Sequence, residues 1–113
     1  MWWADCPARL KGWFDRVWTT GFAYKPAGLR AARQALVLCT AGYSVAELDA
    51  SGCHQAMRTT MLTDRIGERA RSSEFVVFGG SVLRNGKSAG ESEPWAAVKA
   101  GHLARAAELA RSL

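Results

Sequence analysis

Three short segments of the chain carry residues that could meet a ligand at one place. Segments 40–44 and 79–81 each follow a short apolar run, and segment 2–6 would join them if a further strand preceded it. Ligands of open parallel sheets bind outside the carboxyl ends of the strands, where the loops converge and helix N-termini point. These three segments are therefore the predicted ligand site.

The middle segment has the composition of a loop that approaches a flat ring closely. It supplies backbone N–H groups, the Thr40 hydroxyl and Gly42, which has no side chain to obstruct an acceptor-rich ligand. Trp3 and Tyr24 could add stacking surface. Packing in the core is the competing interpretation of both aromatic side chains, because most aromatics serve that purpose.

Helices are predicted before, between and after two apolar runs. Pro7 suits the first position of a helix, and apolar residues continue at helical spacing to about Trp18. Gly21 would end this region. A second helix is predicted from about 53 to 71, and Pro94 can open a third that reaches the end of the chain.

The two apolar runs, 35–39 and 75–78, predict strands that helices cover on both faces. Polar, glycine-containing stretches follow each run and predict loops, and the turn-rich stretch 25–28 predicts a surface connection. Strands that alternate with helices form right-handed crossovers in a parallel sheet. The predicted class is α/β, with residues 1–113 in a single domain.

Two strands alone would leave an apolar, hydrogen-bonding edge open, and proteins normally pair or cover such an edge. The sequence also starts with two tryptophans directly before a helix. A strand upstream of Met1 would account for both features. We therefore expect the chain to be the C-terminal portion of a three-layer α/β/α sheet.

Composition excludes several classes of protein. With 49% hydrophobic and 22% charged residues, the chain is globular in character, not disordered. The longest uncharged stretch, 34–46, is too short to span a bilayer, so no membrane insertion is expected. No secretion signal is evident at the N-terminus, which favours the cytoplasm. The 15 basic and 10 acidic residues are spread along the chain, which favours solvated helix faces over attraction of a nucleotide cofactor and over nucleic-acid binding.

The cysteines and histidines predict neither a disulfide framework nor a metal site. Cys6, Cys39 and Cys53 are odd in number and include no C-x-x-C pair. His54 and His102 are too far apart in the sequence for a familiar zinc pattern.

One long motif resembles a known family. Residues 7–17, P-A-R-L-K-G-W-F-D-R-V, followed by G-F-A-Y at 21–24, closely resemble the NAD(P)H:quinone oxidoreductase family of flavodoxin-like flavoproteins. The resemblance continues more weakly into the T-A-G of 40–42, which is similar to the flavin loop of the family, and into the G-C-H of 52–54. Beyond His54 it rests on the order of the elements.

The resemblance implies the C-terminal part of a flavodoxin-like domain with a bound flavin, FAD being slightly favoured over FMN. NAD(P)H would reduce the flavin, and a quinone would then take a hydride from it; the cofactor carries this chemistry and the protein orients it. A homodimer is implied for the full-length protein. No phosphate-binding glycine motif occurs in the 113 residues, so we expect this chain alone not to retain flavin.

Individual roles follow from the same resemblance. Tyr24 would line the substrate pocket near the partner subunit, and His54 would lie near the pyrimidine edge of the flavin, where a donor stabilises developing negative charge. A helix-start histidine bonded to backbone remains the alternative for His54. The residues that would border the isoalloxazine ring are Trp3, Ala4, Thr40, Ala41 and Gly42.

Two alternatives to an active enzyme remain open. Some relatives of the family are ancillary regulatory subunits of potassium-efflux systems and keep a flavin site. An inactive truncated fragment is the other alternative.

Overall fold

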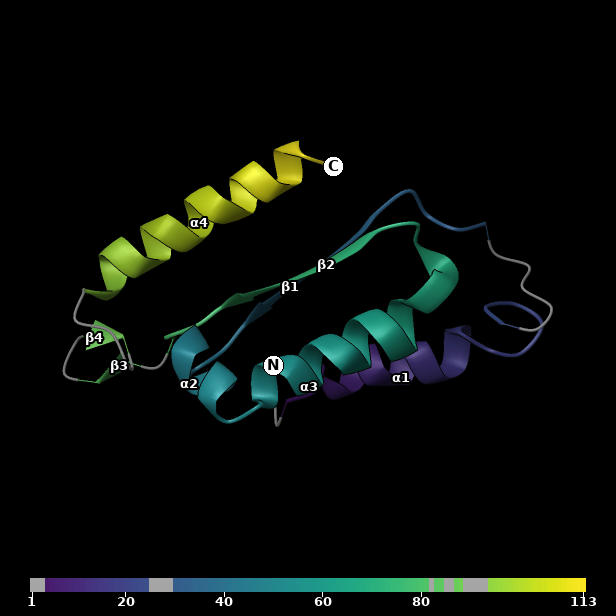
Figure 1. Ribbon diagram of the computed structural model, residues 1–113, viewed down its shortest axis with the longest axis horizontal. Helices are drawn as coiled ribbons and strands as arrows, with labels where there is room; N and C mark the ends of the chain where they lie inside the picture. Colours follow the sequence, from purple (N-terminus) through teal and green to yellow (C-terminus); the bar gives the residue numbers. More distant parts are fainter. Residues whose placement is uncertain (1–3, 25–29, 82, 85–86, 89–93) are drawn as a thin grey trace. The chain divides into compact units, whose positions relative to one another are not determined.

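The computed structural model describes residues 4–24, 30–81, 83–84, 87–88 and 94–113 (Figure 1). Contacts divide the chain into two compact units: Met1–Val37 with Gln55–Phe75, and Leu38–His54 with Val76–Leu113. In chain order the elements are α1 (Ala8–Val17), β1 (Ala35–Thr40), α2 (Val45–Ala50), α3 (Cys53–Arg58), the π-helical η1 (Thr59–Ile66), the 3-10 helix η2 (Gly67–Arg69), β2 (Ser73–Phe78), β3 (Leu83–Arg84), β4 (Lys87–Ser88) and α4 (Trp95–Arg111).

Strands β1 and β2 pair with each other in a parallel arrangement (Figure 1). The N–H of Ala35 donates to the carbonyl oxygen of Ser72 at 2.9 Å, and the N–H of Ala41 donates to that of Phe78 at 2.9 Å. The bonded partners advance together along both segments, as they must in a parallel ladder. The predicted α/β class is confirmed. Leu38 of β1 is nevertheless 43% exposed, so the prediction that both faces of this strand are covered is wrong within the described residues.

The first unit contains α1 and the long helical region before β2. Helix α1 begins at Ala8, one residue after the predicted start, with Pro7 at its N-cap. The single helix predicted over 53–71 is instead three stretches, α3, η1 and η2, of which the middle one winds as a π-helix. Gly67, with φ of 49°, ends η1 in a conformation that side chains rarely adopt. Hydrophobic spacing alone does not distinguish a π-helix from an α-helix, which explains the difference.

The second unit contains a helix, α2, where the sequence predicted a loop. Helix α2 begins at a capping box: the N–H of Glu47 donates to the Ser44 hydroxyl, and the N–H of Ser44 donates to the Glu47 carboxylate. These two bonds satisfy N–H groups that a short helix otherwise leaves unpaired. The loop prediction for the residues of α2 is therefore wrong.

The remainder of the second unit is a small hairpin and the last helix. Strands β3 and β4 pair antiparallel where a loop was predicted. Helix α4 begins after Pro94 as predicted, and it buries Val98 and Leu109. Leu103 of the same helix is 61% exposed. Among the described residues, no helix is both long enough and apolar enough to cross a membrane.

Candidate functional site

The loops that follow β1 and β2 are bonded to each other within the second unit. The N–H of Gly80 donates to the carbonyl oxygen of Tyr43 at 2.8 Å. The carbonyl oxygen of Ala41 accepts from both the N–H of Ser81, at 3.0 Å, and its hydroxyl, at 2.8 Å. Both loops leave the carboxyl ends of adjacent parallel strands, and they converge at that edge of the sheet. The predicted meeting of segments 40–44 and 79–81 is confirmed.

Two glycines permit this close approach. A Cβ atom on Gly79 would lie 2.8 Å from both the carbonyl oxygen of Tyr43 and the nitrogen of Val45, closer than real Cβ contacts come. Gly80 has φ of 74°, a conformation that favours glycine. The sequence predicted a loop here, but not that backbone packing requires its glycines.

Some backbone N–H groups of the loop at 40–44 are hydrogen-bonded within the chain and others are not. The N–H of Ala41 is bonded to Phe78, and that of Ser44 to Glu47. The N–H groups of Gly42 and Tyr43 have no hydrogen-bond acceptor within the part of the chain that the structure describes. Gly42 and Tyr43 are therefore the residues whose backbone can donate to a ligand, while Ala41 holds the loop in place.

His54 is oriented by a carboxylate in the same unit. Its Nδ1 lies 2.7 Å from Oδ1 of Asp49, and the histidine side chain is 20% exposed. Gly52, with φ of 76°, makes the turn between α2 and α3 that brings the two residues together. A carboxylate bonded to one ring nitrogen fixes the orientation of an imidazole. The carboxylate partner was not anticipated from the sequence.

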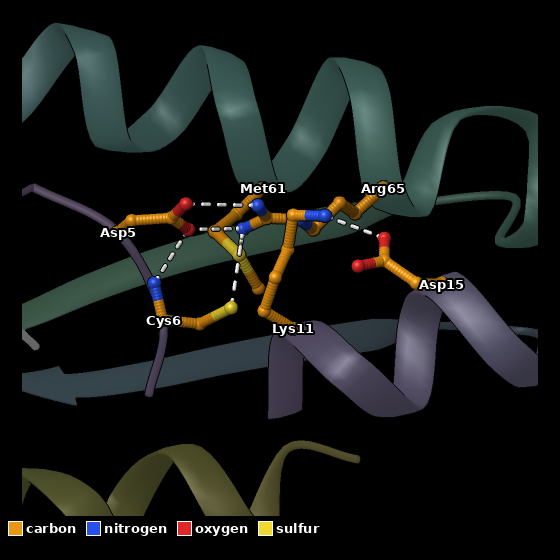
Figure 2. A network of polar contacts seen from close by, with 6 residues as sticks. All are labelled: Asp5, Cys6, Lys11, Asp15, Met61 and Arg65. Carbon is orange, nitrogen blue, oxygen red and sulfur yellow. Dashed lines mark hydrogen bonds and ion pairs between the residues drawn. The ribbon is translucent and has the colours of Figure 1, made fainter. Parts of the chain in front are cut away.

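The first unit contains a buried arginine bonded to Asp5 (Figure 2). Nη1 of Arg65 donates to Oδ1 of Asp5 at 2.5 Å, and Nη2 donates to Oδ2 at 3.1 Å. Nη1 also lies 3.3 Å from Sγ of Cys6 and 3.2 Å from Sδ of Met61. The hydrogen bond from Arg65 lowers the pKa of Asp5 to about 2. Ala4, immediately before this aspartate, has φ of 60°, which is uncommon for a residue with a side chain.

A pocket of about 460 Å³ lies beside Tyr24 in the first unit. Tyr24 is 45% exposed, and its carbonyl oxygen accepts from the N–H of Gly21 at 2.7 Å. The guanidinium of Arg69 lies 4.5 Å from the ring centre of Trp18 and 5.9 Å from that of Tyr24. Aromatic and charged side chains line the pocket: Lys11, Phe14, Asp15, Trp18, Tyr24, Asp64, Arg65 and Arg69.

The predicted site residues are divided between the two units. Ala4 and Tyr24 belong to the first unit, whereas Thr40, Ala41, Gly42 and His54 belong to the second. Thr40 ends β1 and is exposed. Trp3 and the 25–28 connection lie outside the described residues. Arg65 and Arg69 were not predicted as site residues, because the contacts that place them, Arg65 with Asp5 and Arg69 with Trp18, join residues far apart in the sequence.

Comparison with known proteins identifies similar molecules. A family model described as flavodoxin-like fold matches residues 1–65. The solved structure of an NAD(P)H:quinone oxidoreductase from Methanothermobacter marburgensis is similar, with 44% sequence identity and a TM-score of 0.68. The match covers 74% of this chain and 42% of that chain, so the present chain spans less than half the length of that structure. No curated protein matches at a significant level.

Proposed function

Because the chain belongs to the flavodoxin-like fold family, we propose that it forms part of a flavin-dependent NAD(P)H:quinone oxidoreductase. The observation that carries the proposal is the convergence of the loops after β1 and β2, where Gly80 bonds to Tyr43. Parallel sheets bind ligands at this edge. The similarity to the Methanothermobacter marburgensis structure supplies the reaction class.

The residues of the first loop fit the ring system of a flavin. The pyrimidine portion of the flavin is rich in hydrogen-bond acceptors. The N–H groups of Gly42 and Tyr43 have no acceptor among the described residues. We propose that these two groups, with Thr40 and the backbone that Ala41 holds, border the isoalloxazine. The flavin-border role of Trp3 and Ala4 is proposed on the family resemblance alone. When bound, the flavin would accept a hydride from NAD(P)H and donate a hydride to a quinone. FAD is favoured over FMN, as the resemblance to the FAD-using members implies.

The proposed role of His54 is to stabilise negative charge near the pyrimidine edge. Asp49 holds the imidazole by its Nδ1 at 2.7 Å, so the ring does not need to reorient when charge develops. Preorganised donors of this kind contribute to rate because their orientation is already fixed before the reaction. The Asp49 contact favours this role over that of a histidine that only bonds backbone.

Tyr24 is the proposed quinone-pocket residue. It lines the 460 Å³ pocket with Phe14 and Trp18, and these rings offer apolar surface for a planar substrate. A homodimer in the cytoplasm is the proposed state of the complete protein, following the family resemblance.

The test compares two proteins. One is the 113-residue chain; the other joins it to the part of the Methanothermobacter marburgensis protein that this chain does not match. Bound flavin is measured by absorbance after gel filtration, and NAD(P)H oxidation is measured with and without a quinone. We expect the joined protein to be yellow and to oxidise NAD(P)H only with quinone, and the short chain to retain little flavin. A joined protein with native circular dichroism that binds no flavin would overturn the proposal.

A further inference from the structure

Arg69 is held rigidly at the wall of the pocket in the first unit. Its Nη1 donates to the carbonyl oxygens of Arg65 and Ile66, each at 3.3 Å. The guanidinium stacks on Trp18, with 4.5 Å between the guanidinium carbon and the ring centre. A guanidinium fixed by carbonyl groups and an aromatic face loses little further freedom when it binds a ligand.

The other cationic side chains of the pocket already have carboxylate partners. Lys11 pairs with Asp15 on α1, and Arg65 pairs with Asp5 (Figure 2). Arg69, by contrast, contacts no carboxylate among the described residues, and its Nε is buried without a hydrogen-bond acceptor there. A half-buried cation without a counter-ion is an electrostatic position that an anion can fill.

The surroundings of Arg69 restrict the shape of that anion. Trp18 and Tyr24 present aromatic faces beside the guanidinium, and Phe14 adds a third ring to the lining. The volume of about 460 Å³ lies within the range of small-molecule sites. The exposed carboxylate of Asp64 also lines the pocket and opposes an anion from that side.

We propose that this pocket binds planar aromatic ligands that carry a carboxylate or sulfonate, with Arg69 as the anion-binding residue and Trp18 and Tyr24 as the aromatic walls. The proposal rests on the proposed function in one respect: if Tyr24 lines the quinone pocket, the preferred substrates are quinones with an anionic substituent. The binding itself requires neither flavin nor NAD(P)H, so it can be tested separately.

The experiment is isothermal titration of the chain with 2-naphthoate and with 2-naphthylmethanol, its neutral analogue of similar shape. We expect 2-naphthoate to bind more tightly. Arg69→Gln should weaken 2-naphthoate binding roughly ten- to hundred-fold, the usual contribution of a hydrogen bond to a charged group, and should weaken 2-naphthylmethanol binding much less. Arg69→Lys should recover part of the loss, because it keeps the charge but not the planar fork.

Two further variants control the result. Arg16→Gln removes an exposed cation of α1 that does not line the pocket, and it should leave both affinities unchanged. Asp64→Asn removes the opposing charge while leaving Arg69 intact, so it should tighten 2-naphthoate binding several-fold even if Arg69→Gln impairs folding. Equal affinities for the two ligands, or no tightening in Asp64→Asn, would overturn the proposal.

The joined oxidoreductase separates this inference from the proposed function. There, Arg69→Gln should raise KM for 1,2-naphthoquinone-4-sulfonate about ten-fold or more beyond any change that it causes in KM for 1,2-naphthoquinone. If the enzyme is inactive but 2-naphthoate still binds, the proposed function fails and the site stands. If it is active without this discrimination, the site fails and the function stands.

Discussion

Asp5 and Arg65, 60 positions apart in the sequence, form a two-point ion pair in the first unit (Figure 2). The arginine side chain is 7% exposed, while that of the aspartate is 43% exposed. A buried guanidinium without its carboxylate would retain an uncompensated charge, whereas the aspartate is partly solvated on its own. The pair therefore fixes the segment before α1 to the η1 helix.

The first prediction concerns the stability that this pair contributes. Asp5→Asn should lower the free energy of unfolding by about 1–2 kcal/mol, less than for a fully buried pair because solvent screens the exposed carboxylate. Urea denaturation followed by circular dichroism measures the change. Asp15→Asn, which breaks the exposed Lys11 pair on α1, is the matched control and should cost under about 0.5 kcal/mol. Equal losses of stability in the two variants would show that the Asp5–Arg65 pair contributes no more than an exposed ion pair.

The second prediction is the pH dependence of the same contact. The pKa of Asp5 is lowered from 3.8 to about 2 in the folded chain, mainly by the hydrogen bond from Arg65. Because the folded pKa lies below the unfolded one, the stabilisation is complete above about pH 4 and is lost as the pH falls from 4 towards 2. The stability difference between the original chain and Asp5→Asn should shrink over this window in urea titrations. A difference that stays constant from pH 5 to pH 2 would show that the carboxylate charge is not responsible.

The third prediction tests the contact between the strand-end loops. Gly79→Ala places a Cβ 2.8 Å from backbone atoms of Tyr43 and Val45, which cannot rotate away, so it should destabilise the chain by about 1–3 kcal/mol. Gly101→Ala in α4 is the control, because its Cβ meets nothing within 4 Å. That substitution should instead stabilise the helix by about 0.5–1 kcal/mol. Thermal unfolding of the two variants should shift in opposite directions.

Residue spacing within short segments predicted the helix α1 and the strand β1. The apolar spacing after Pro7 gave α1, and the run 35–39 gave a strand one residue shorter than β1. Helix α2 was missed although Ser44 and Glu47 carry the spacing of a capping box, because the polar, glycine-containing stretch around them favoured a loop.

The contacts between distant segments in the candidate site could not be predicted from the sequence. Nothing in the sequence relates Arg65 to Asp5, since an ion pair across 60 residues depends on how the helix packs. The role of Gly79 is similar, because the clash that excludes a side chain involves backbone atoms of a different loop. Convergence of the two loops was predicted because it follows from a general rule for parallel strands.

The fourth prediction concerns Tyr24, on the proposed function. In the joined oxidoreductase, Tyr24→Ala should raise KM for quinone several-fold, because it removes one aromatic wall of the pocket. Flavin content should stay unchanged. Tyr43→Ala is the control, because Tyr43 is 59% exposed, does not line this pocket and bonds to the neighbouring loop through its backbone. If Tyr24→Ala leaves KM unchanged for quinones of different size, Tyr24 does not line the quinone pocket.

The last prediction separates His54 from the carboxylate that orients it. In the joined protein, His54→Ala should slow flavin reduction by NAD(P)H by roughly one to three orders of magnitude if the imidazole stabilises developing charge. Asp49→Asn keeps the imidazole but replaces a charged acceptor with a neutral amide at the 2.7 Å contact. It should therefore slow the step by a smaller factor, and combining it with His54→Ala should add nothing, because Asp49 acts through His54. Stopped-flow absorbance at the flavin band measures each rate, with flavin occupancy as the control for folding. Unchanged rates in His54→Ala would leave the histidine with a purely structural role in the turn between α2 and α3.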